Sequence, residues 1–498
     1  MPVIRVKQVG DKIKDILSKE VTMSHKTLFV NFLAAVFLLV GCTLPATPAS
    51  PAVTPSSAPV LTLTSLPAPT QVSTLPPVIT ATNVPVPTQA PTTASTTVPT
   101  QVPTTVPTQA PTAVPTTIPG AIPHFAAGSD VTLTQVRIFS KTEGWAVGRN
   151  TTLDPNSEHI LRTADGGATW QDVTPAQKAG TGAAGSGPAL QAEAFFLDGQ
   201  RAWAGFSPQP GSSIIVSSIW YTTDAGQTWQ TSAALSQGSG TPEYFAPGPI
   251  TFLPDGKTGW LLVHAGQGMN HDYIYIFSTA DGGVHWNLKV DPMDINKGSI
   301  MSCYKSGLGF VDANSGWLAG SCNGVAAGVL LFNTKDGGGA WNAVSLPAPS
   351  QAPNILTAGD FSCGSQPPLF VSAKEGFLAM TCSTFDQAKA SQTWIYVTTD
   401  GGATWTPRLA PAPKGNFQFI NASEGWFVGG GQIFKTGDGG KTWAALTKVT
   451  WAGAQPSFID AKTGWAVAFS GQEPNVQYAL VSSANGGATW ALIKAKVK

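Results

Sequence analysis

The sequence predicts an all-β protein whose folded part is a seven-bladed β-propeller of four-stranded blades. Three observations predict it. A phrase of the form T-x-D-G-G-x-T-W occurs seven times, a second phrase centred on G-W precedes each copy, and short alternating apolar runs flank both. Alternating runs bounded by Gly, Asp and Asn favour strands over helices. Seven small sheets cannot bury their faces alone, so a radial arrangement, in which each sheet packs on its neighbours, is expected.

The first phrase sets the period of the repeat. Its copies end at Trp170, Trp229, Trp286, Trp341, Trp405, Trp443 and Trp490, and successive copies are 38 to 64 residues apart. Such periods indicate a repeated supersecondary unit. The acidic position of the phrase is held by Asp165, Asp224, Asp281, Asp336, Asp400 and Asp438, with Asn485 in the last copy.

The second phrase completes each unit. It is centred on Trp145, Trp203, Trp260, Trp317, Phe377, Trp426 and Trp465. Each unit therefore consists of a strand, a turn, a strand, a loop, a third strand, a tight turn and a fourth strand, and the first phrase forms the tight turn. Gly tolerates the positive φ of a tight hairpin, Asp accepts backbone N–H groups within the turn, and Trp buries a large ring between blades. We therefore assign these acidic residues a structural role.

At this point a resemblance can be stated. The phrase is similar to the Asp-box, or bacterial neuraminidase repeat. The combination of "GWxVG" and "TxDGGxTW" units resembles the photosystem II assembly and stability factor family of propellers, over nearly all of 131–498. That resemblance implies a role in handling membrane protein complexes. Asp-boxes also occur in sialidases, xyloglucanases and sorting receptors, where they lie on the face away from the active site, so the motif is specific for fold rather than function.

The N-terminus has the layout of a secretory signal. Lys26 precedes an apolar run from Leu28 to Val40, and Gly41 and Cys42 follow. The ending "LVGC" resembles the bacterial lipobox, which implies that residues 1–42 are a lipoprotein signal peptide and that Cys42 is lipidated. Met23 is a possible true start. The alternative is an ordinary membrane helix with an incidental cysteine.

The next segment, 43–125, is predicted to be a disordered linker rich in Pro and Thr. No Asp, Glu, Lys or Arg occurs from Thr43 to Ser129. Such a composition cannot bury enough apolar surface to offset chain entropy, and its prolines favour polyproline II. Composition leaves open whether its threonines carry sugar. The propeller is then expected over 126–498. Net charge is zero and no basic stripe occurs, which argues against nucleic acid as a partner.

Four cysteines remain besides Cys42. Cys303 and Cys322 are 19 residues apart, as are Cys363 and Cys382, and both pairs hold equivalent places in the fourth and fifth units. Each pair is centred near the first turn of its unit, so its members face each other across a hairpin. We predict disulfides Cys303–Cys322 and Cys363–Cys382, which an exported location permits. Free buried thiols and a four-thiolate metal site are the alternatives, although the spacing is a poor zinc pattern.

Recognition is expected on one face of the propeller. The first and third turns of the units share a face and are short and uniform. The loop after the second strand and the link between blades share the opposite face and vary in length, so binding residues are sought there. The candidates are Glu243, Tyr244, Phe245, His264, His271, Asp272, Trp451 and Glu473.

Enzymatic alternatives find less support. A sialidase needs three converging arginines, yet only Arg137, Arg149, Arg162, Arg201 and Arg408 follow the signal. Another glycosidase needs two carboxylates across a cleft, and nothing in the sequence pairs Asp272 with Glu473. No catalytic residue, metal site or cofactor is assigned.

The function predicted from sequence is thus a non-enzymatic binding or assembly scaffold. It is expected to be a monomer, lipid-anchored on the extracytoplasmic face of a bacterial cell membrane. Its partner would be a protein, as in a membrane complex, or a glycan or other envelope component. A secreted glycoside hydrolase, sialidase-like or xyloglucanase-like, is the alternative. All seven units look complete, so strand exchange between the termini is not required, and the segment 124–133 is a candidate addition to the last blade.

Overall fold

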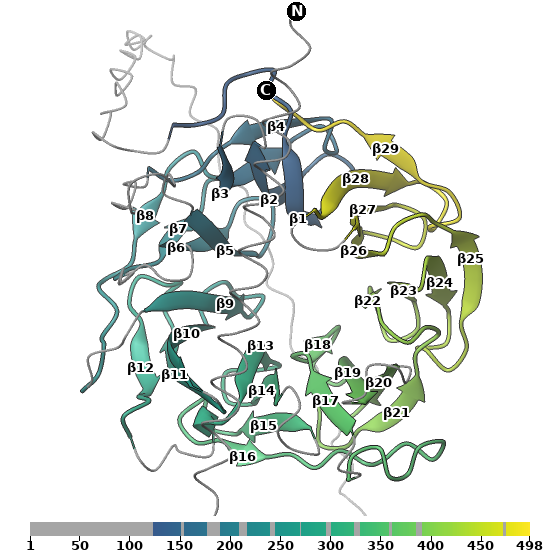
Figure 1. The fold of residues 1–498 in the computed structure, drawn as a ribbon. Coiled ribbons are helices and arrows are strands. Elements are labelled where there is room, and N and C mark those ends of the chain that lie inside the picture. The colour runs from purple at the N-terminus through teal and green to yellow at the C-terminus, as the bar shows by residue number, and fades with distance from the viewer. Residues whose placement is uncertain are drawn as a thin grey trace, which may run out of the picture. The chain divides into compact units, whose positions relative to one another are not determined.

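The computed structural model describes residues 123–150, 154–176, 190–208, 217–239, 245–268, 270–294, 300–322, 329–357, 361–384, 391–471 and 475–498. The predicted signal peptide, Cys42 and almost all of the predicted linker lie outside this part of the chain. The described residues form seven antiparallel sheets arranged around an axis (Figure 1), which confirms the predicted seven-bladed, all-β fold.

The blades follow one another along the chain. Blade 1 contains β1 (Thr132–Ile138), β2 (Gly144–Asn150), β3 (Asp154–Thr163), β4 (Thr169–Asp172) and, from the far end of the chain, β30 (Lys496–Val497). Blade 2 contains β5 (Leu190–Phe196), β6 (Ala202–Pro208), β7 (Trp220–Thr222) and β8 (Gln230–Thr231). Blade 3 contains β9 (Ala246–Phe252), β10 (Gly259–Gly268), β11 (His271–Thr279) and β12 (Asn287–Val290).

Blade 4 contains β13 (Tyr304–Phe310), β14 (Gly316–Ser321), β15 (Leu330–Thr334) and β16 (Asn342–Ala343). Blade 5 contains β17 (Phe361–Ser365), β18 (Leu369–Phe370), β19 (Gly376–Thr384), β20 (Gln392–Thr398) and β21 (Thr406–Leu409). Blade 6 contains β22 (Asn416–Phe419), β23 (Gly425–Gly429), β24 (Gln432–Thr436) and β25 (Ala444–Lys448). Blade 7 contains β26 (Gly453–Phe458), β27 (Gly464–Ser470), β28 (Gln477–Ser483) and β29 (Ala491–Ile493).

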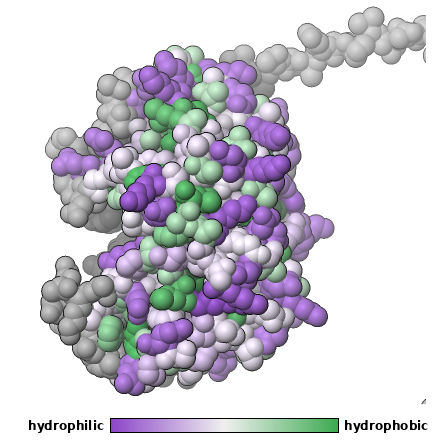
Figure 2. All heavy atoms as spheres, turned by 90° about the vertical axis from the view of Figure 1, so that its right-hand side faces the viewer, coloured by the Kyte–Doolittle hydropathy of each residue, from purple (hydrophilic) through white to green (hydrophobic). Residues whose placement is uncertain are grey.

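Burial changes from the inner to the outer strands of each blade. The second strands are buried along most of their length, and β23 at every position, because neighbouring blades cover both of their faces. The outermost strands, such as β8 and β16, are exposed. On the side shown in Figure 2, hydrophobic residues are scattered among hydrophilic ones, as expected for outer strands that face water.

An aromatic stack holds adjacent blades together. At most seams the ring at the G-W position of one blade stacks on a Phe at the end of the first strand of the next. Trp260 stacks on Phe310 at 3.5 Å between centroids, and the Asp-box ring of Trp341 meets Phe310 edge-on. The same arrangement joins Trp426, Phe458 and Trp490. Aromatic pairs in these geometries contribute beyond their buried area.

The glycine of the G-W phrase permits this stack. At Gly259 a Cβ atom would lie 2.6 Å from the ring of Phe252, and Trp203 stacks on that ring at 3.7 Å. Blade 2 has Ala202 at the equivalent position. There the centroids of Trp145 and Phe196 are 5.5 Å apart, because the methyl group of the alanine takes up the space next to the ring.

The indole N–H groups add a hydrogen bond across most of these seams. Trp203 donates to the carbonyl of Gly282 at 2.7 Å, and Trp465 donates to that of Gly166 at 2.8 Å, joining blade 7 to blade 1. Both of these acceptors belong to the Asp-box turn of the following blade, whereas Trp145 donates to the Asp198 carbonyl in the first turn of blade 2. The G-W residue is therefore an inter-blade connector, which explains why it is repeated together with the Asp-box.

Two blades depart from four strands. In blade 5 the prolines Pro367 and Pro368 separate β17 from β18, since proline lacks the N–H that the ladder requires. In blade 1 the C-terminal strand β30 pairs in parallel with β4, and the C-terminus lies beside β4 in Figure 1.

The ring closes through the C-terminal strand. The segment 124–133 was a candidate addition to the last blade, but its residues contact β30 on blade 1 instead. Gly128 N–H donates to the Val497 carbonyl, and Val497 N–H donates to the Ser129 carbonyl, each at 2.8 Å. Phe125 stacks on His159, whose Nδ1 lies 2.7 Å from Asp172. Both ends of the described propeller are therefore fixed to its first blade.

The structure contains both predicted disulfides, Cys303–Cys322 and Cys363–Cys382. Cys363 and Cys382 are directly opposite each other in the register of β17 and β19, as expected for residues equidistant from a hairpin turn.

Candidate functional site

The Asp-box carboxylates serve their own hairpins. Asp165 accepts hydrogen bonds from the N–H and hydroxyl of Thr169, at 2.9 and 2.6 Å, and from the hydroxyl of Thr163. Burial alone would raise the pKa of Asp165, but these hydrogen bonds outweigh it and the pKa is lowered. The same N–H bond four residues on is made by Asp224, Asp281, Asp336, Asp400, Asp438 and Asn485.

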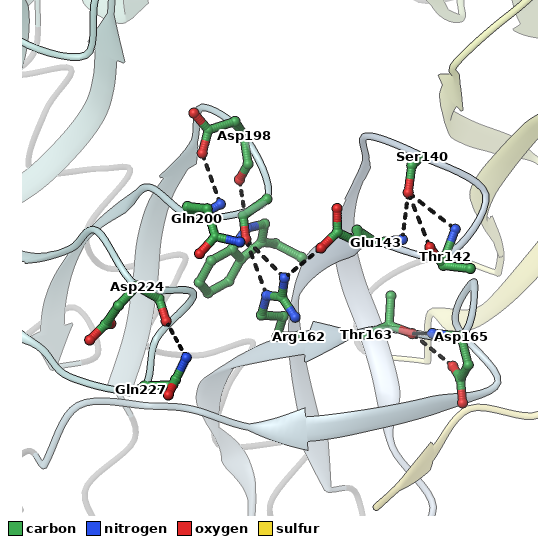
Figure 3. Close-up of polar contacts among 12 residues, drawn as sticks. Ser140, Thr142, Glu143, Arg162, Thr163, Asp165, Asp198, Gln200, Asp224 and Gln227 are labelled. Atoms are coloured by element: carbon green, nitrogen blue, oxygen red, sulfur yellow. Dashed lines mark hydrogen bonds and ion pairs between the residues drawn. The ribbon is translucent and has the colours of Figure 1, made fainter. Parts of the chain in front are cut away.

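These carboxylates do not converge on a pocket. Figure 3 shows Asp165 and Asp224 in separate hairpins, and each carboxylate accepts the N–H of the threonine four residues on in its own turn. The turns have positive φ at glycine pairs such as Gly166 and Gly167 (73° and 93°). Blade 2 has Ala225 at the first position, with φ of 63°. The structure thus gives the Asp-boxes a structural role.

The two predicted faces are present. Gly166 N–H in the third turn of blade 1 donates to the Thr142 carbonyl in its first turn at 2.9 Å, so these turns share one face, the Asp-box face. The second strands therefore end on the opposite, variable face. Glu243, Tyr244 and Glu473 lie outside the described residues.

Two variable-face candidates are not surface groups. Phe245 is fully buried and packs against Tyr275 and Phe277, because it fills the core between blades 2 and 3. Trp451 is half-buried and meets the ring of Trp490 edge-on, between blades 6 and 7. The prediction that Phe245 is available for binding was therefore wrong. Trp451 is partly covered because it packs between blades 6 and 7.

Three other candidates, His264, His271 and Asp272, are brought together at the variable-face end of blade 3. His264 Nδ1 is 2.8 Å from Asp272 Oδ1, while Asp272 Oδ2 accepts the backbone N–H of Lys305 in blade 4 at 2.8 Å. His264 and Asp272 are only 9% and 1% exposed, so they are not the contact groups that the sequence suggested. Their mutual hydrogen bond makes this burial possible.

Exposed rings lie on this buried support. Tyr304 stacks on His264 with centroids 5.2 Å apart and is 48% exposed. Tyr273 stacks on exposed His271 at 5.9 Å and is itself 41% exposed. Both tyrosines were missed by sequence reasoning. The alternation along β11, with Asp272 buried and Tyr273 exposed, is the signal that could have identified Tyr273.

The support under Tyr304 is tightly held. Lys305 is fully buried, and its Nζ donates to the carbonyls of Ser302 and Cys303 at 2.7 Å each. Burial lowers the pKa of Lys305 to about 8, against an opposing effect from Asp272. Cys303 is bonded to Cys322, which links the residue before β13 to the end of β14. Tyr304 is therefore presented from a rigid position.

A carboxyl group without a partner lies nearby. Glu193 is midway along β5, and among the described residues it makes no hydrogen bond or ion pair, whereas Glu158 pairs with Arg149 at 2.9 Å. Burial, and then the charge of Glu158, raise the pKa of Glu193 to about 7. Burial and then the charges of Asp272 and Glu193 raise the pKa of Tyr304, which relates Glu193 to the same region.

We call Glu193, His271, Tyr273 and Tyr304 the rim cluster. Its accessible groups are three rings and one acid, and its support is His264, Asp272 and Lys305. This arrangement can stack on a partner's side chains and accept a positive charge.

The arginines are distributed over both faces. Arg162, Arg201 and Arg408 donate to carbonyls of turns on the Asp-box face, those of Gly199, Asp255 and Gly439. Arg149 is bonded to Glu158, and Arg137 is exposed on β1. This distribution does not assemble the three converging arginines of a sialidase.

The described part of the chain contains no cluster of three or more potential metal ligands. It also contains no helix that is long and apolar enough to cross a membrane.

Comparison with known proteins agrees with the hairpin geometry. A BNR/Asp-box repeat model matches residues 396–407. No curated protein matches the sequence. Among solved structures, YCF48 bound to a D1 peptide is 17% identical and covers 73% of this chain and 96% of that chain, with a TM-score of 0.42.

Two further solved structures are similar to this chain. YCF48 from Cyanidioschyzon merolae is 16% identical, over 72% of this chain and 97% of that chain, with a TM-score of 0.43. An oligogalacturonate lyase from Vibrio parahaemolyticus is 9% identical, over 75% and 93%, with a TM-score of 0.45. The sheet topology, the seven hairpins and the repeat match together identify this chain as a seven-bladed β-propeller built on BNR/Asp-box repeats.

Proposed function

We propose that this propeller is a non-enzymatic binding or assembly scaffold that holds a partner on the rim cluster. The observation that carries the proposal is the exposure of Tyr273 and Tyr304 on a buried, hydrogen-bonded support. Large rings on a rigid support lose little conformational entropy on binding, which is why tyrosine is enriched at recognition sites.

The charge of the rim cluster suggests what the partner carries. Glu193 lacks a cation among the described residues, and the neighbouring acids are already paired with Arg149 and His264. A partner's Lys or Arg placed beside Glu193 and Tyr304 would gain both an ion pair and a cation–π contact. The partner segment is therefore expected to combine basic and apolar side chains.

The setting of this scaffold is also a proposal. Lipidation at Cys42 would anchor the chain on the extracytoplasmic face of a bacterial membrane, and the 43–125 linker would extend the propeller away from it. The partner would then be a membrane protein complex or another envelope component. The sequence resemblance to photosystem II assembly factors supports the former.

A glycoside hydrolase is the second candidate, and one observation favours it. Glu193 has a raised pKa while nearby Glu158 is held by Arg149. In glycoside hydrolases, two carboxyl groups whose environments differ in this way act as the general acid and as the base or nucleophile. The scaffold remains preferred because Glu158 is fully engaged, also accepting the N–H of Ala192 at 3.0 Å.

The scaffold is tested by capture from solubilised bacterial envelope with the immobilised full chain. The Tyr273→Ala/Tyr304→Ala double variant should retain about tenfold less of the partner than the native chain, because hot-spot rings carry most interface energy. Leu409→Ala is the matched control, since Leu409 is 45% exposed on the outer strand β21 of blade 5. Equal losses in both variants would refute the proposal.

The hydrolase is tested separately by turnover of sialosides and plant glucans. The scaffold predicts no turnover. Turnover that disappears in Glu193→Gln would replace the scaffold with an enzyme.

A further inference from the structure

A cleft of about 580 Å³ lies on the Asp-box face, within the seam where blade 7 meets blade 1. We call it the closing cleft. Its lining includes Lys141 from the first turn of blade 1 and, from blade 7, Lys462, Thr463, Ser482, Trp490 and Ala491. It is on the face opposite the rim cluster, so it is separate from the site proposed above.

At several other seams a long basic side chain crosses the space between blades. At four seams a basic side chain of one blade donates to a backbone carbonyl of the next, and these side chains are Arg162, Arg201, Arg408 and Lys435. Figure 3 shows Arg162 filling the seam between blades 1 and 2, where it also pairs with Glu143 at 3.0 Å.

Blade 7 lacks this pair. In blade 1 Arg162 lies beside Trp145 in the sheet register, and in blade 6 Lys435 lies beside Trp426 and pairs with Glu424 at 3.3 Å. In blade 7 the residue paired with Trp465 is Ser482 on β28, and Ser482 is paired in turn with Ala491 on β29.

The acid of the pair is missing as well. Glu143 and Glu424 each precede the G-W tryptophan by two residues, and the equivalent residue in blade 7 is Thr463. Both members of the ion pair are thus replaced by short hydroxyl side chains. Blade 3 has the same residue types at these two positions, Thr258 and Ser278. At the seam after blade 7 the space that a long side chain fills at the four seams above is open, and hydroxyl groups line it.

The cleft is also positively charged. Its lining contains two lysines and no carboxylate. Asp460 lies close by, and its Oδ1 accepts the N–H groups of Lys462 and Thr463 at 2.7 Å each. Among the described residues, the ammonium groups of Lys141 and Lys462 donate no hydrogen bond.

We propose that the closing cleft binds a saccharide that carries a carboxylate or a sulfate. Lys141 and Lys462 would pair with the acidic group, and the hydroxyls of Thr463 and Ser482 would bond to sugar hydroxyls. The half-buried ring of Trp490 adds apolar surface. The volume falls within the range of ordinary ligand sites.

The strand pairing argues against a peptide in this place. β28 is paired on one side with β27 and on the other with β29, so the part of the cleft that β28 forms is the face of a sheet rather than a strand edge. Hydroxyl and ammonium groups on such a face match a ring that has several hydroxyls and one acid.

The test measures binding to the full chain by calorimetry, with cellobiouronic acid, neutral cellobiose and N-acetyl-dialanine as probes. The acidic disaccharide should bind about tenfold more tightly than cellobiose, because only it forms charge-assisted bonds. Ser482→Arg recreates the side chain of blade 1 and should fill the cleft, with a loss of about tenfold or more. Ser278→Arg is the matched control, since Ser278 lies beside Trp260 in blade 3, and it should leave binding unchanged.

Three results would overturn the proposal: equal affinity for the acidic and neutral disaccharides, no binding of the acidic disaccharide, or full binding by Ser482→Arg. Tighter binding of the peptide carboxylate than of the uronate would also overturn the saccharide assignment. The Lys141→Gln/Lys462→Gln variant provides an independent check, because both residues are exposed and their replacement does not disturb the core. It should bind the two disaccharides equally.

Discussion

The two faces of this propeller use acidic residues in opposite ways. On the Asp-box face, each carboxylate is bound by backbone and hydroxyl groups of its own hairpin, as Asp400 is by Thr404 at 2.9 and 2.6 Å. In the rim cluster, Glu193 on the inner strand β5 has no partner among the described residues, and its pKa is raised to about 7 rather than lowered.

This difference separates residues that maintain the fold from residues that are available to a ligand. A carboxylate whose hydrogen-bonding capacity is used within a turn has little left for a partner, however often it recurs. A desolvated carboxylate without a cation still gains from meeting one. Repetition therefore marks structure here, and departure from the repeat marks both the rim cluster and the closing cleft.

The largest expected effect tests the seams. Trp260→Ala removes a ring that is 1% exposed and stacked on Phe310, and we expect a loss of about 3–5 kcal/mol in the free energy of unfolding. Tyr273→Ala on the rim should change it by about 0.5 kcal/mol or less. Urea denaturation measures both. Similar losses of unfolding free energy in the two variants would contradict the distinction between seam residues and rim residues.

The disulfides refine the comparison further. Removal of either by paired Cys→Ala substitutions should cost about 3 kcal/mol, from the chain entropy of a loop of this length. Only the loss of Cys303–Cys322 should also weaken partner capture, because that bond supports the backbone before Tyr304. Equal capture by both variants would show that partner binding at the rim cluster does not depend on the Cys303–Cys322 disulfide.

Glu193→Gln should stabilise the protein at neutral pH. The folded-state pKa of about 7 lies above the ordinary 4.5, so ionisation opposes folding increasingly from about pH 4.5 to pH 7 and fully above that. After allowance for solvent exposure, we expect a gain of about 1 kcal/mol at pH 8 and none at pH 4. Thermal melting at the two pH values decides this, and a gain of the same size at both would contradict the assignment.

The smallest expected effect concerns an Asp-box. The pKa of Asp400 is lowered to about 2, chiefly by the hydroxyl and N–H of Thr404, so its contribution is present above its ordinary value of 3.8 and is lost as pH falls toward 2. Asp400→Asn, which copies Asn485, should flatten the stability profile slightly in that interval. An unchanged stability profile would mean that the carboxylate of Asp400 stabilises the fold no more than an amide does.

Much of the fold could be predicted because it is repeated. The hairpin glycines, the G-W markers and the cysteine spacing each appear in equivalent places, so one unit informs the next. The strand β30 was missed, since a two-residue parallel pairing with Thr169 and Trp170 has no periodic pattern of its own.

The candidate site was less predictable, because exposure there depends on neighbouring blades. Phe245 and Tyr304 are both aromatic residues near strand ends, yet one fills the core beside Tyr275 and the other stacks outward on His264. The pairing of His264 with Asp272 follows from the register of β10 and β11, which places them close across a bulge.

The most direct test of the division between the faces is hydrogen–deuterium exchange of the full chain, free and bound to the captured partner. We predict protection of peptides that contain 271–273 and 302–305, with no change in the seven Asp-box hairpins. Protection of those hairpins with an unchanged rim would contradict the account.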